Sequence, residues 1–286
     1  MTRNRLYRPT RLAQVMKDHG IDTKKCFGQN FLIDGNIVEG ILRGAEVGEE
    51  DVILEIGTGI GTLTEALALA AKSVFAVEID TRLAPVLEDT LEGLENVEIL
   101  FEDVLKVDLK EELARRFPGK KVKVVANLPY YVTTPILGAL LGQDLPLSSI
   151  TVMVQKEVAK RMVAPPGGKD YGALSVFVQY YSHAAIVLDV PRTVFYPAPR
   201  VDSAVIHMDL KENLPEGGEQ FFLVVKAAFS KRRKTLLNAL SSFEGRWSKD
   251  EVREALGEAN IEENTRAEAL DEASFLALAK ALPKGR

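Results

Sequence analysis

The residues best suited to chemistry lie in one short stretch, Ala126 to Tyr131, which reads Ala-Asn-Leu-Pro-Tyr-Tyr. It follows a β-branched run, 121–125, that predicts a buried parallel strand. Open α/β sheets bind ligands where such strands end. At this position Asn127 offers a side-chain carbonyl and the chain around Pro129 offers a main-chain carbonyl. Tyr130 offers an aromatic face. Two acceptors beside a stacking ring suit a planar group with an amino nitrogen, such as adenine. An ordinary strand-to-loop turn is equally compatible with these residues taken alone.

A second stretch predicts a nucleoside site. Residues 55–64 place three glycines at alternate positions, between an expected strand at 51–56 and an expected helix at 63–71. Glu78 ends the next strand, about twenty residues further on, where a carboxylate binds ribose hydroxyls in nucleoside-binding βαβ units. The dinucleotide pattern G-x-G-x-x-G would require glycine where Thr62 stands. The spacing G-x-G-x-G favours a ligand without a pyrophosphate, such as the amino-acid end of S-adenosylmethionine.

Two further groups could contact such a ligand. Asp103 follows an expected strand and could accept a hydrogen bond from an adenine amino group, although a helix N-cap is equally compatible. In the stretch 27–32, Gly28 permits close backbone approach, and Gln29 and Asn30 can each donate and accept hydrogen bonds. A surface turn is the alternative for this stretch.

Composition limits the remaining possibilities. With 286 residues, 46% of them apolar, the chain predicts one large domain and a smaller one. No apolar run is long enough for a membrane span, and no apolar segment follows the charged first residues as it would in a secretory signal. The single cysteine, Cys26, allows no intrachain disulfide and indicates a reducing cytosol. With three histidines besides, a nitrogen and sulfur metal site is not expected.

Basic residues cluster in two places, although the net charge is −5. Residues 1–30 hold seven basic and two acidic side chains, and residues 231–234 read Lys-Arg-Arg-Lys. Local basic patches, rather than net charge, determine affinity for phosphates. Both clusters are therefore candidate nucleic-acid contacts, and solvated surface charge remains the alternative for either one alone.

Strands alternate with helices as far as residue 210, which predicts a parallel sheet with an antiparallel edge. The seven expected strands are 51–56, 73–77, 97–101, 121–125, 149–155, 183–190 and 201–210. A polar, glycine-bearing segment, 213–220, is the expected linker. The helices expected after it are 221–228, 232–241, 249–259 and 274–282. The predicted division is a basic arm at 1–30, a catalytic domain at 31–212 and a helical, RNA-contacting domain at 213–286.

Taken together, the motifs resemble those of the KsgA-type small-subunit ribosomal RNA adenine dimethyltransferases, over nearly the whole chain. The stretches that carry the resemblance are 28–32, 55–61, 78–80, 127–130, 195–205 and 231–236. One minor departure is Thr58, where proline is common. The resemblance implies an α/β fold: a seven-stranded, Rossmann-like methyltransferase domain that uses S-adenosyl-L-methionine, followed by a small all-α domain.

The resemblance also implies an activity. Methyl groups would pass from S-adenosyl-L-methionine to the N6 amines of two adjacent adenosines in the 3′-terminal hairpin loop of small-subunit (16S) rRNA. The reaction would occur late in small-subunit biogenesis, in the cytoplasm. A monomer with no membrane association and no obligate protein partner is expected.

Residue by residue, the resemblance implies three sets of contacts. The catalytic set is Asn127, Leu128, Pro129, Tyr130 and Phe195. The cofactor set is Gln29, Asn30, Leu32, Gly57, Gly59, Glu78, Asp103 and Asn127. The RNA-contacting set is Arg3, Arg5, Arg8, Lys24, Lys25, Arg200, Lys231, Arg232, Arg233 and Lys234. No metal is expected.

Other functions remain open at this point. A large-subunit rRNA adenine methyltransferase shares the fold and chemistry, although Leu128 and the run 201–204 look more like the small-subunit type. A ribosome-assembly or transcription factor could keep the fold without catalysis, but the intact stretch 127–130 and the glycine turn speak against this. DNA and protein-glutamine methyltransferases usually have proline where Leu128 stands.

Overall fold

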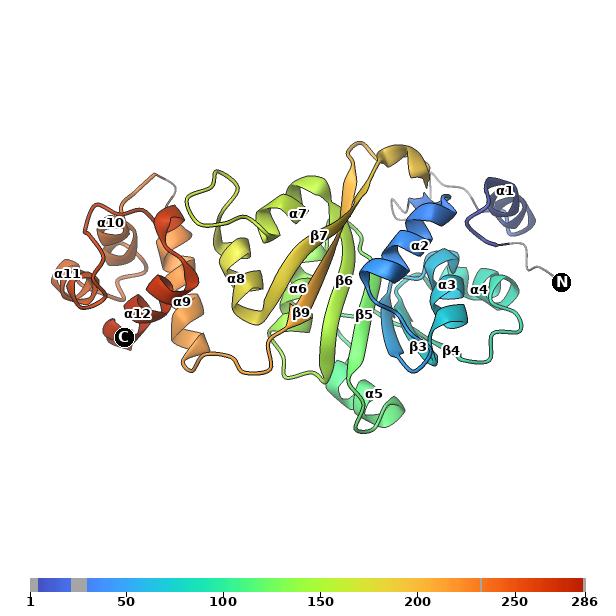
Figure 1. Cartoon of the computed structure of the whole chain (residues 1–286), viewed down its shortest axis with the longest axis horizontal. Helices are drawn as coiled ribbons and strands as arrows, with labels where there is room; N and C mark the ends of the chain where they lie inside the picture. The colour runs from blue at the N-terminus through green and yellow to red at the C-terminus, as the bar shows by residue number, and fades with distance from the viewer. Residues whose placement is uncertain (1–4, 22–29, 232, 285–286) are drawn as a thin grey trace. The chain divides into compact units, whose positions relative to one another are not determined.

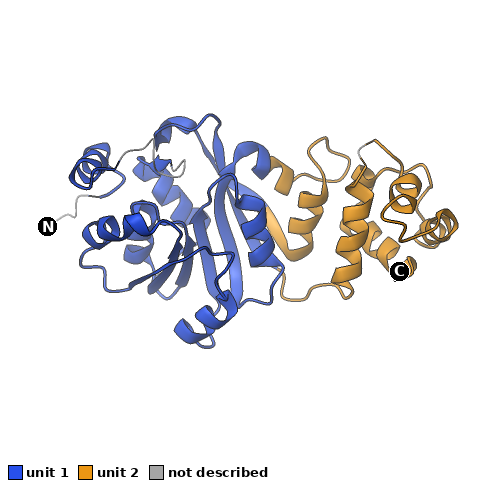
Figure 2. Cartoon of the chain, turned by 180° about the vertical axis from the view of Figure 1, so that it is seen from behind, with its two compact units in different colours: residues 1–159, 185–210 blue, residues 160–184, 211–286 orange. Residues whose placement is uncertain are grey.

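The computed structural model describes residues 5–21, 30–231 and 233–284, and Figure 1 shows its helices and strands. The chain divides into two compact units, coloured separately in Figure 2. Unit 1 comprises Met1–Ala159 and Ala185–Leu210, and unit 2 comprises Lys160–Ala184 and Lys211–Arg286. No helix in the described residues is long and apolar enough to cross a lipid bilayer.

This division differs from the expected boundary at residue 212 because residues 160–184 group with the C-terminal helices. Helix α8 (Ala173–Tyr181) packs against α9 (Gly218–Phe229), where the rings of Tyr180 and Phe221 stack with centroids 4.8 Å apart. The Tyr171 hydroxyl also donates to the Leu270 carbonyl at 2.7 Å. Both aromatic contacts join positions far apart in the sequence, which residue patterns alone do not show.

The described part of the expected N-terminal arm also belongs to a larger body, unit 1. Helix α1 (Pro9–Asp18) buries Leu12 and Val15 in an apolar cluster that includes Phe31 and Ile60. Just before it, the backbone N–H of Leu6 donates to the Glu65 carboxylate at 3.0 Å.

Unit 1 is built on a sheet that confirms the predicted seven strands. Its order is β4-β3-β2-β5-β6-β9-β7. The strands, in chain order, are β2 (Val52–Ile56), β3 (Ser73–Glu78), β4 (Val97–Phe101), β5 (Val122–Asn127), β6 (Leu147–Gln155), β7 (Ser182–Val190) and β9 (Ser203–Leu210). Strand β9 pairs antiparallel with β6, one position in from the edge strand β7. The antiparallel strand predicted from the sequence is therefore present, but it lies inside the sheet.

The register brings the candidate residues to one edge of the sheet. Strands β4, β3, β2, β5 and β6 run parallel, with Ile56 opposite Val77 and Glu78 opposite Phe101. Asn127, at the end of β5, lies opposite Met153 of β6. The segments that follow β2, β3, β4 and β5 therefore all leave the sheet at its carboxyl edge, where ligands bind in this architecture.

Helices cover the sheet, and the central strands are buried, as is typical of parallel strands. Helices α2 (Gly35–Gly44) and α3 (Thr62–Ala70) share an apolar cluster with Ile53, Val125 and Met153. The remaining helices of the sheet region are η1 (Thr81–Leu83), α4 (Ala84–Thr90), α5 (Leu109–Arg116), α6 (Thr133–Leu141), α7 (Lys156–Met162) and η2 (Arg192–Val194).

A second, two-stranded sheet was not predicted. It consists of β1 (Phe31–Leu32) and β8 (Phe195–Tyr196), which pair antiparallel with Leu32 opposite Phe195. The pairing joins two segments more than 160 residues apart in the sequence. Strands of two residues have no detectable periodicity, so the pattern of apolar residues could not reveal them.

Beyond residue 211, the regular elements in the described part of unit 2 are all helices, as predicted, around a core that includes Phe221, Trp247 and Phe275. Besides α9 these elements are α10 (Leu236–Ser241), α11 (Lys249–Glu258), η3 (Ala267–Ala269) and α12 (Glu272–Ala281). The helix predicted to start at Arg232 begins instead at Leu236, after Thr235 as N-cap. Arg233 has φ +74°, which is incompatible with a right-handed helix, so the described part of the basic run forms a turn.

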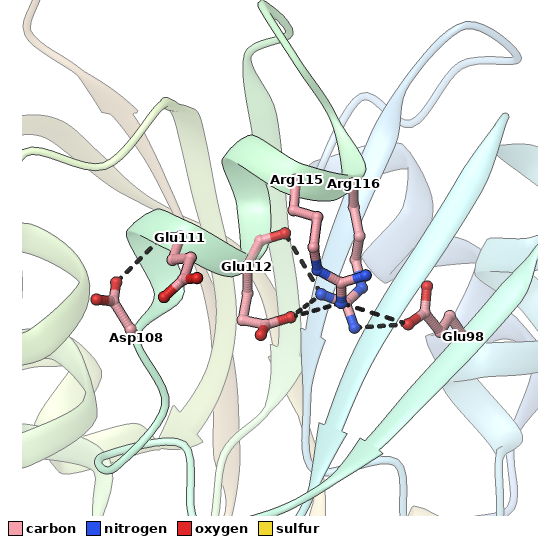
Figure 3. Close-up of polar contacts among 6 residues, drawn as sticks. All are labelled: Glu98, Asp108, Glu111, Glu112, Arg115 and Arg116. Carbon is pink, nitrogen blue, oxygen red and sulfur yellow. Dashed lines mark hydrogen bonds and ion pairs between the residues drawn. The ribbon is translucent and has the colours of Figure 1, made fainter.

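One pair of basic residues in unit 1, Arg115 and Arg116, forms ion pairs with neighbouring carboxylates, as Figure 3 shows. The Arg116 side chain is only 8% exposed, and its guanidinium lies 3.9 Å from the centre of the Phe75 ring. It contacts the carboxylates of Glu112 and Glu98, which Arg115 also approaches. These charges are neutralised locally, so the Arg115–Arg116 pair is a structural feature of β4 and α5 rather than a phosphate-binding patch.

Candidate functional site

The carboxyl edge of the main sheet carries a cleft of about 410 Å³, entirely within unit 1. Every candidate catalytic residue lines it, and so does every candidate cofactor residue in the described part of the chain. These residues are Asn30, Leu32, Gly57, Gly59, Glu78, Asp103, Asn127, Leu128, Pro129, Tyr130 and Phe195. Gln29, the remaining cofactor candidate, lies outside the described residues.

The glycine turn exposes backbone to this cleft. Gly57, Gly59 and Gly61 have φ angles of +79°, +54° and +90°, which side-chain-bearing residues rarely adopt. Gly61 is also the N-cap of α3, and a Cβ there would lie 3.0 Å from the Leu91 side chain. Gly61 therefore serves helix packing as well as the turn, whereas Gly57 and Gly59 line the cleft.

Glu78 is held rigidly beside the turn. Its side chain is buried, and one carboxylate oxygen accepts hydrogen bonds from the Gly59 N–H at 3.0 Å and the Thr58 hydroxyl at 3.1 Å. The other oxygen accepts from the Asp80 N–H at 2.9 Å. The end of β3 is thus tied directly to the glycine turn after β2, which fixes the carboxylate in the lining of the cleft.

Asp103 lies in a turn and caps no helix. Its carboxylate accepts from the Leu105 N–H at 3.0 Å, and the next helix, α5, begins at Leu109 with Asp108 as its N-cap. The helix-cap interpretation of Asp103 is therefore wrong, and the side chain sits in the cleft wall.

The loop after β5 is anchored by hydrogen bonds to its backbone, from within the loop and from neighbouring elements. The Leu128 N–H donates to the Met153 carbonyl at 3.2 Å. The Pro129 carbonyl accepts from the Val132 N–H at 3.2 Å and from the Thr133 hydroxyl at 3.1 Å. Because the Pro129 carbonyl is occupied within the loop, the main-chain acceptor for a ligand is better assigned to Leu128.

Two aromatic residues form walls of the cleft. The Tyr130 hydroxyl lies 2.7 Å from the Ser203 hydroxyl oxygen, in hydrogen-bond contact across to β9. Burial raises the pKa of Tyr130, and the Ser203 hydrogen bond only partly opposes this, so the phenol stays protonated at neutral pH. Phe195 is 3% exposed and is placed by the β1–β8 pairing opposite Leu32. The sequence pattern did not reveal either Ser203 or the pairing as supports for these walls.

Apolar residues next to the acidic candidates complete the cleft. Ile79 follows Glu78 directly, and Val104 and Leu105 follow Asp103. Ile79 is 56% exposed and Leu105 is 43% exposed, which is high for such side chains. The sequence feature that could have identified these residues as part of the site is their position just after Glu78 and Asp103. We expect them to contact the faces of a flat ring.

The charge of the cleft selects among nucleoside ligands. Glu78, Glu102 and Asp103 line it, and no lysine, arginine or histidine does so among the described residues. A pyrophosphate would find no cationic partner there, whereas a sulfonium and an ammonium group would be favoured. Together with the exposed glycine backbone, this donor and acceptor set fits S-adenosylmethionine.

Fold and cleft together define an S-adenosylmethionine-dependent methyltransferase. The chain belongs to the ribosomal RNA adenine dimethylase family, whose model matches residues 20–284.

Individual relatives agree with this assignment. The chain is 49% identical to the ribosomal RNA small subunit methyltransferase A of Alkaliphilus oremlandii over 284 residues, which is 98% of this chain and 99% of that protein. It is 50% identical to the protein of the same name from Ligilactobacillus salivarius, over 96% of this chain and 95% of that one. Among solved structures, a dimethyladenosine transferase from Plasmodium falciparum superposes with a TM-score of 0.74 at 26% identity, covering 87% of this chain and 95% of that one. The 23S rRNA methyltransferase ErmE superposes with a TM-score of 0.67 at 27% identity, covering 88% of this chain and 99% of that one.

One buried carboxyl close to the cleft has no assigned role. Glu55 precedes the glycine turn, is fully buried, and neither of its oxygens has a hydrogen bond of ordinary geometry to the described residues. Burial raises the pKa of Glu55 to about 8, with the charge of Glu78 adding to the shift and the Thr64 hydroxyl opposing it. The carboxyl is therefore mostly protonated at neutral pH.

This burial predicts a specific pH dependence of stability. Because the folded-state pKa of Glu55 lies above its ordinary value of 4.5, the folded protein keeps a proton that the unfolded chain loses. The contribution of Glu55 to stability therefore falls as pH rises from about 4.5 towards about 8. In the Glu55→Gln variant this contribution is absent, so its unfolding free energy should gain about 1.4 kcal/mol per pH unit over the parent.

Urea unfolding at pH 5.5, 6.5 and 7.5 measures the effect. The exposed Glu50→Gln variant is the matched control and should follow the parent at all three values. A Glu55→Gln variant whose stability runs parallel to the parent across this range would contradict the buried, protonated carboxyl.

Unlike Arg115 and Arg116, which pair with carboxylates, the basic residues predicted to contact RNA are not neutralised by ion pairs within the described residues. Those within the described residues are Arg5, Arg8, Arg200, Lys231, Arg233 and Lys234, and all but the partly buried Arg5 are exposed. Within that part of the chain none of them forms an ion pair with a carboxylate. Arg3, Lys24, Lys25 and Arg232 lie outside the described residues.

Proposed function

We propose that this protein dimethylates the N6 amines of two adjacent adenosines in the 3′-terminal hairpin loop of small-subunit rRNA. The single observation that carries the proposal is one cleft that combines the glycine turn and Glu78 with the Asn127–Tyr130 loop and Phe195. Membership of the ribosomal RNA adenine dimethylase family and near full-length similarity to small-subunit methyltransferases support the choice of substrate.

S-adenosyl-L-methionine, when bound, supplies a methyl group on a positively charged sulfonium, whose sulfur leaves as the neutral thioether of S-adenosylhomocysteine. Glu78 would accept hydrogen bonds from its ribose hydroxyls and Asp103 from its adenine amino group. Asn30, Leu32, Gly57 and Gly59 would contact it through the turn and the β1 segment. These roles are supported by the acidic lining, to which the described residues contribute no cation.

Asn127 and Leu128 have the central task of activating a poor nucleophile. The N6 lone pair of adenine is delocalised into the ring. The Asn127 side-chain oxygen and the Leu128 carbonyl would accept the two amine hydrogens and so direct the lone pair out of the ring plane. The same oxygens would stabilise the positive charge that develops on nitrogen, the counterpart of an oxyanion hole with opposite sign.

Tyr130 and Phe195 would hold the target base between them. The adenine must leave its stack to enter the cleft, and base–aromatic stacking contributes about 1–3 kcal/mol per base. Because the Tyr130 phenol is protonated and fixed to Ser203, it acts as a wall and not as a base. The proton of the methylated amine is acidic and can pass to water, so no general base is assigned.

The second methylation places a demand on the same residues. After the first transfer the amine keeps one hydrogen, so only one of the two acceptors can still be used. The monomethylated group must therefore rotate about the C6–N6 bond inside the cleft. The proposal thus includes both transfers at one site.

Small subunits that lack these methyl groups provide the direct test. We expect the full-length protein with labelled S-adenosylmethionine to place label on two adjacent adenosines near the 3′ end of small-subunit rRNA, and none on large subunits assayed alongside. Label on large-subunit rRNA alone would assign the protein to the other rRNA substrate, and binding without any transfer would indicate an assembly factor.

The exposed basic residues are the proposed RNA contacts. In the helical domain, the described residues proposed to bind RNA phosphates are Lys231, Arg233 and Lys234. Removing a cation that binds one phosphate should reduce the slope of log K against log salt by about 0.7–0.9. We expect the double variant Lys231→Ala, Arg233→Ala to show a slope reduced by about one to two, measured by binding to small subunits at several salt concentrations. Arg115→Ala, which removes a cation already paired with Glu98 and Glu112, is the matched control, and an equal slope in all three proteins would contradict the assignment.

The setting of the reaction follows from its substrate. We propose a cytoplasmic protein that acts as a monomer on the small ribosomal subunit late in ribosome biogenesis. The rRNA-modifying relatives support the partner. Sedimentation of the protein with and without small subunits would test the monomer and the complex together.

A further inference from the structure

A second tyrosine stands at the mouth of the cleft. Tyr131 follows the wall residue Tyr130 directly, lines the cleft, and is 72% exposed. Within the described part of the chain its ring contacts no other aromatic ring and its hydroxyl makes no hydrogen bond. No role in the folded core or in the proposed chemistry of the target base accounts for this ring.

The turn that presents Tyr131 is held on both sides of it. Before it, the Tyr130 hydroxyl is bound to Ser203 at 2.7 Å. After it, the Val132 N–H and the Thr133 hydroxyl both donate to the Pro129 carbonyl, where α6 begins. A tyrosine has only two side-chain torsions, so a ring on such a turn loses little conformational entropy when a ligand covers it.

The position of Tyr131 also limits what it can contact. The walls for an extruded base are already formed by Tyr130, which is partly buried, and by Phe195, which is 3% exposed. A ring that is mostly in solvent cannot share that enclosed space. The nucleotide next to an extruded base must, however, pass the mouth of the cleft, because one phosphodiester link joins it to the base inside.

We propose that Tyr131 is a substrate-binding residue that stacks on the base adjacent to the target adenine. The inference rests on the proposed function, in which the neighbour is the second adenosine of the pair. An aromatic face accepts any base, so Tyr131 can hold the unmodified adenosine or the dimethylated one. The same ring would then serve both halves of the reaction.

The test separates stacking from a general effect on the protein. Small subunits are reconstituted with rRNA that carries an abasic nucleotide in place of the neighbouring adenosine, and with unaltered rRNA. On unaltered subunits Tyr131→Leu should lower kcat/KM about tenfold, whereas Tyr131→Phe, which keeps the ring, should stay within about twofold of the parent. Affinity for S-adenosylhomocysteine should be unchanged in both variants. Tyr131→Ser provides a second ring deletion should Tyr131→Leu fold poorly.

Non-additivity is the decisive result. On abasic subunits the parent should itself lose about tenfold, and Tyr131→Leu should lose nothing further, because both changes remove the same stack. Tyr196→Leu, at an exposed tyrosine outside the cleft lining, is the control and should show no coupling to the abasic change.

Two results would overturn the inference. One is a Tyr131→Leu variant with parental activity on unaltered subunits. The other is an undiminished tenfold loss for that variant on abasic subunits. A parent protein that methylates neither substrate would instead refute the proposed function, and the inference with it.

Discussion

The Asn127→Ala variant should bind S-adenosylmethionine within about tenfold of the parent and yet turn over roughly two or more orders of magnitude more slowly. The reason is that, in the proposed mechanism, Asn127 would supply an acceptor that matters most as positive charge develops on the adenine nitrogen. Its side chain lines the cleft at the end of β5, whereas most of the proposed cofactor contacts come from β3 and from the turns that follow β2 and β4.

Equilibrium binding of labelled cofactor and single-turnover methylation of unmodified small subunits separate the two quantities. Asn127→Asp is an informative companion because it keeps an acceptor oxygen of nearly the same size. Near-normal turnover in Asn127→Ala would refute the role of the side chain, even if cofactor binding were intact.

Glu78→Ala should weaken binding of S-adenosylmethionine by about two orders of magnitude. Charge-assisted hydrogen bonds contribute roughly 1.5–3 kcal/mol each, and a carboxylate can receive two from a ribose. The variant also frees the Gly59 N–H and the Thr58 hydroxyl that Glu78 now holds, which loosens the glycine turn.

Calorimetric titration with S-adenosylhomocysteine measures this effect directly. Glu78→Gln keeps the shape and one acceptor oxygen, so its affinity should fall between those of the parent and Glu78→Ala. Glu98→Ala, at a carboxylate on β4 outside the cleft lining, controls for loss of negative charge. Parental affinity in Glu78→Ala would contradict the assignment of the ribose site.

The central part of the site could be predicted because its residues stand at strand ends. Glu78, Asp103 and Asn127 each terminate or follow a run of apolar, β-branched residues, and parallel strands bring such positions to one edge. The glycine spacing added the turn between β2 and α3. Local patterns and one topological rule were sufficient for these positions.

What the sequence left open depends on contacts between distant segments. Phe195 reaches the cleft through a two-residue strand that pairs with Leu32, and Tyr130 is fixed by Ser203 of β9. Neither contact leaves a periodic signal. Similarly, the helix expected from Arg232 starts at Leu236, because Arg233 has φ +74°, a backbone conformation that the residue types of the basic run do not indicate.

The measurement that tests the account most directly is a crystal structure of the full-length protein with S-adenosylhomocysteine and a short single-stranded RNA containing the two adenosines. The account predicts the ribose against Glu78 and one adenine between Tyr130 and Phe195, with its N6 within hydrogen-bond distance of the Asn127 side-chain oxygen and the Leu128 carbonyl. A cofactor in this cleft whose sulfur faces away from residue 127, or an adenine bound elsewhere with the cleft closed to it, would contradict the claim that these residues perform the transfer.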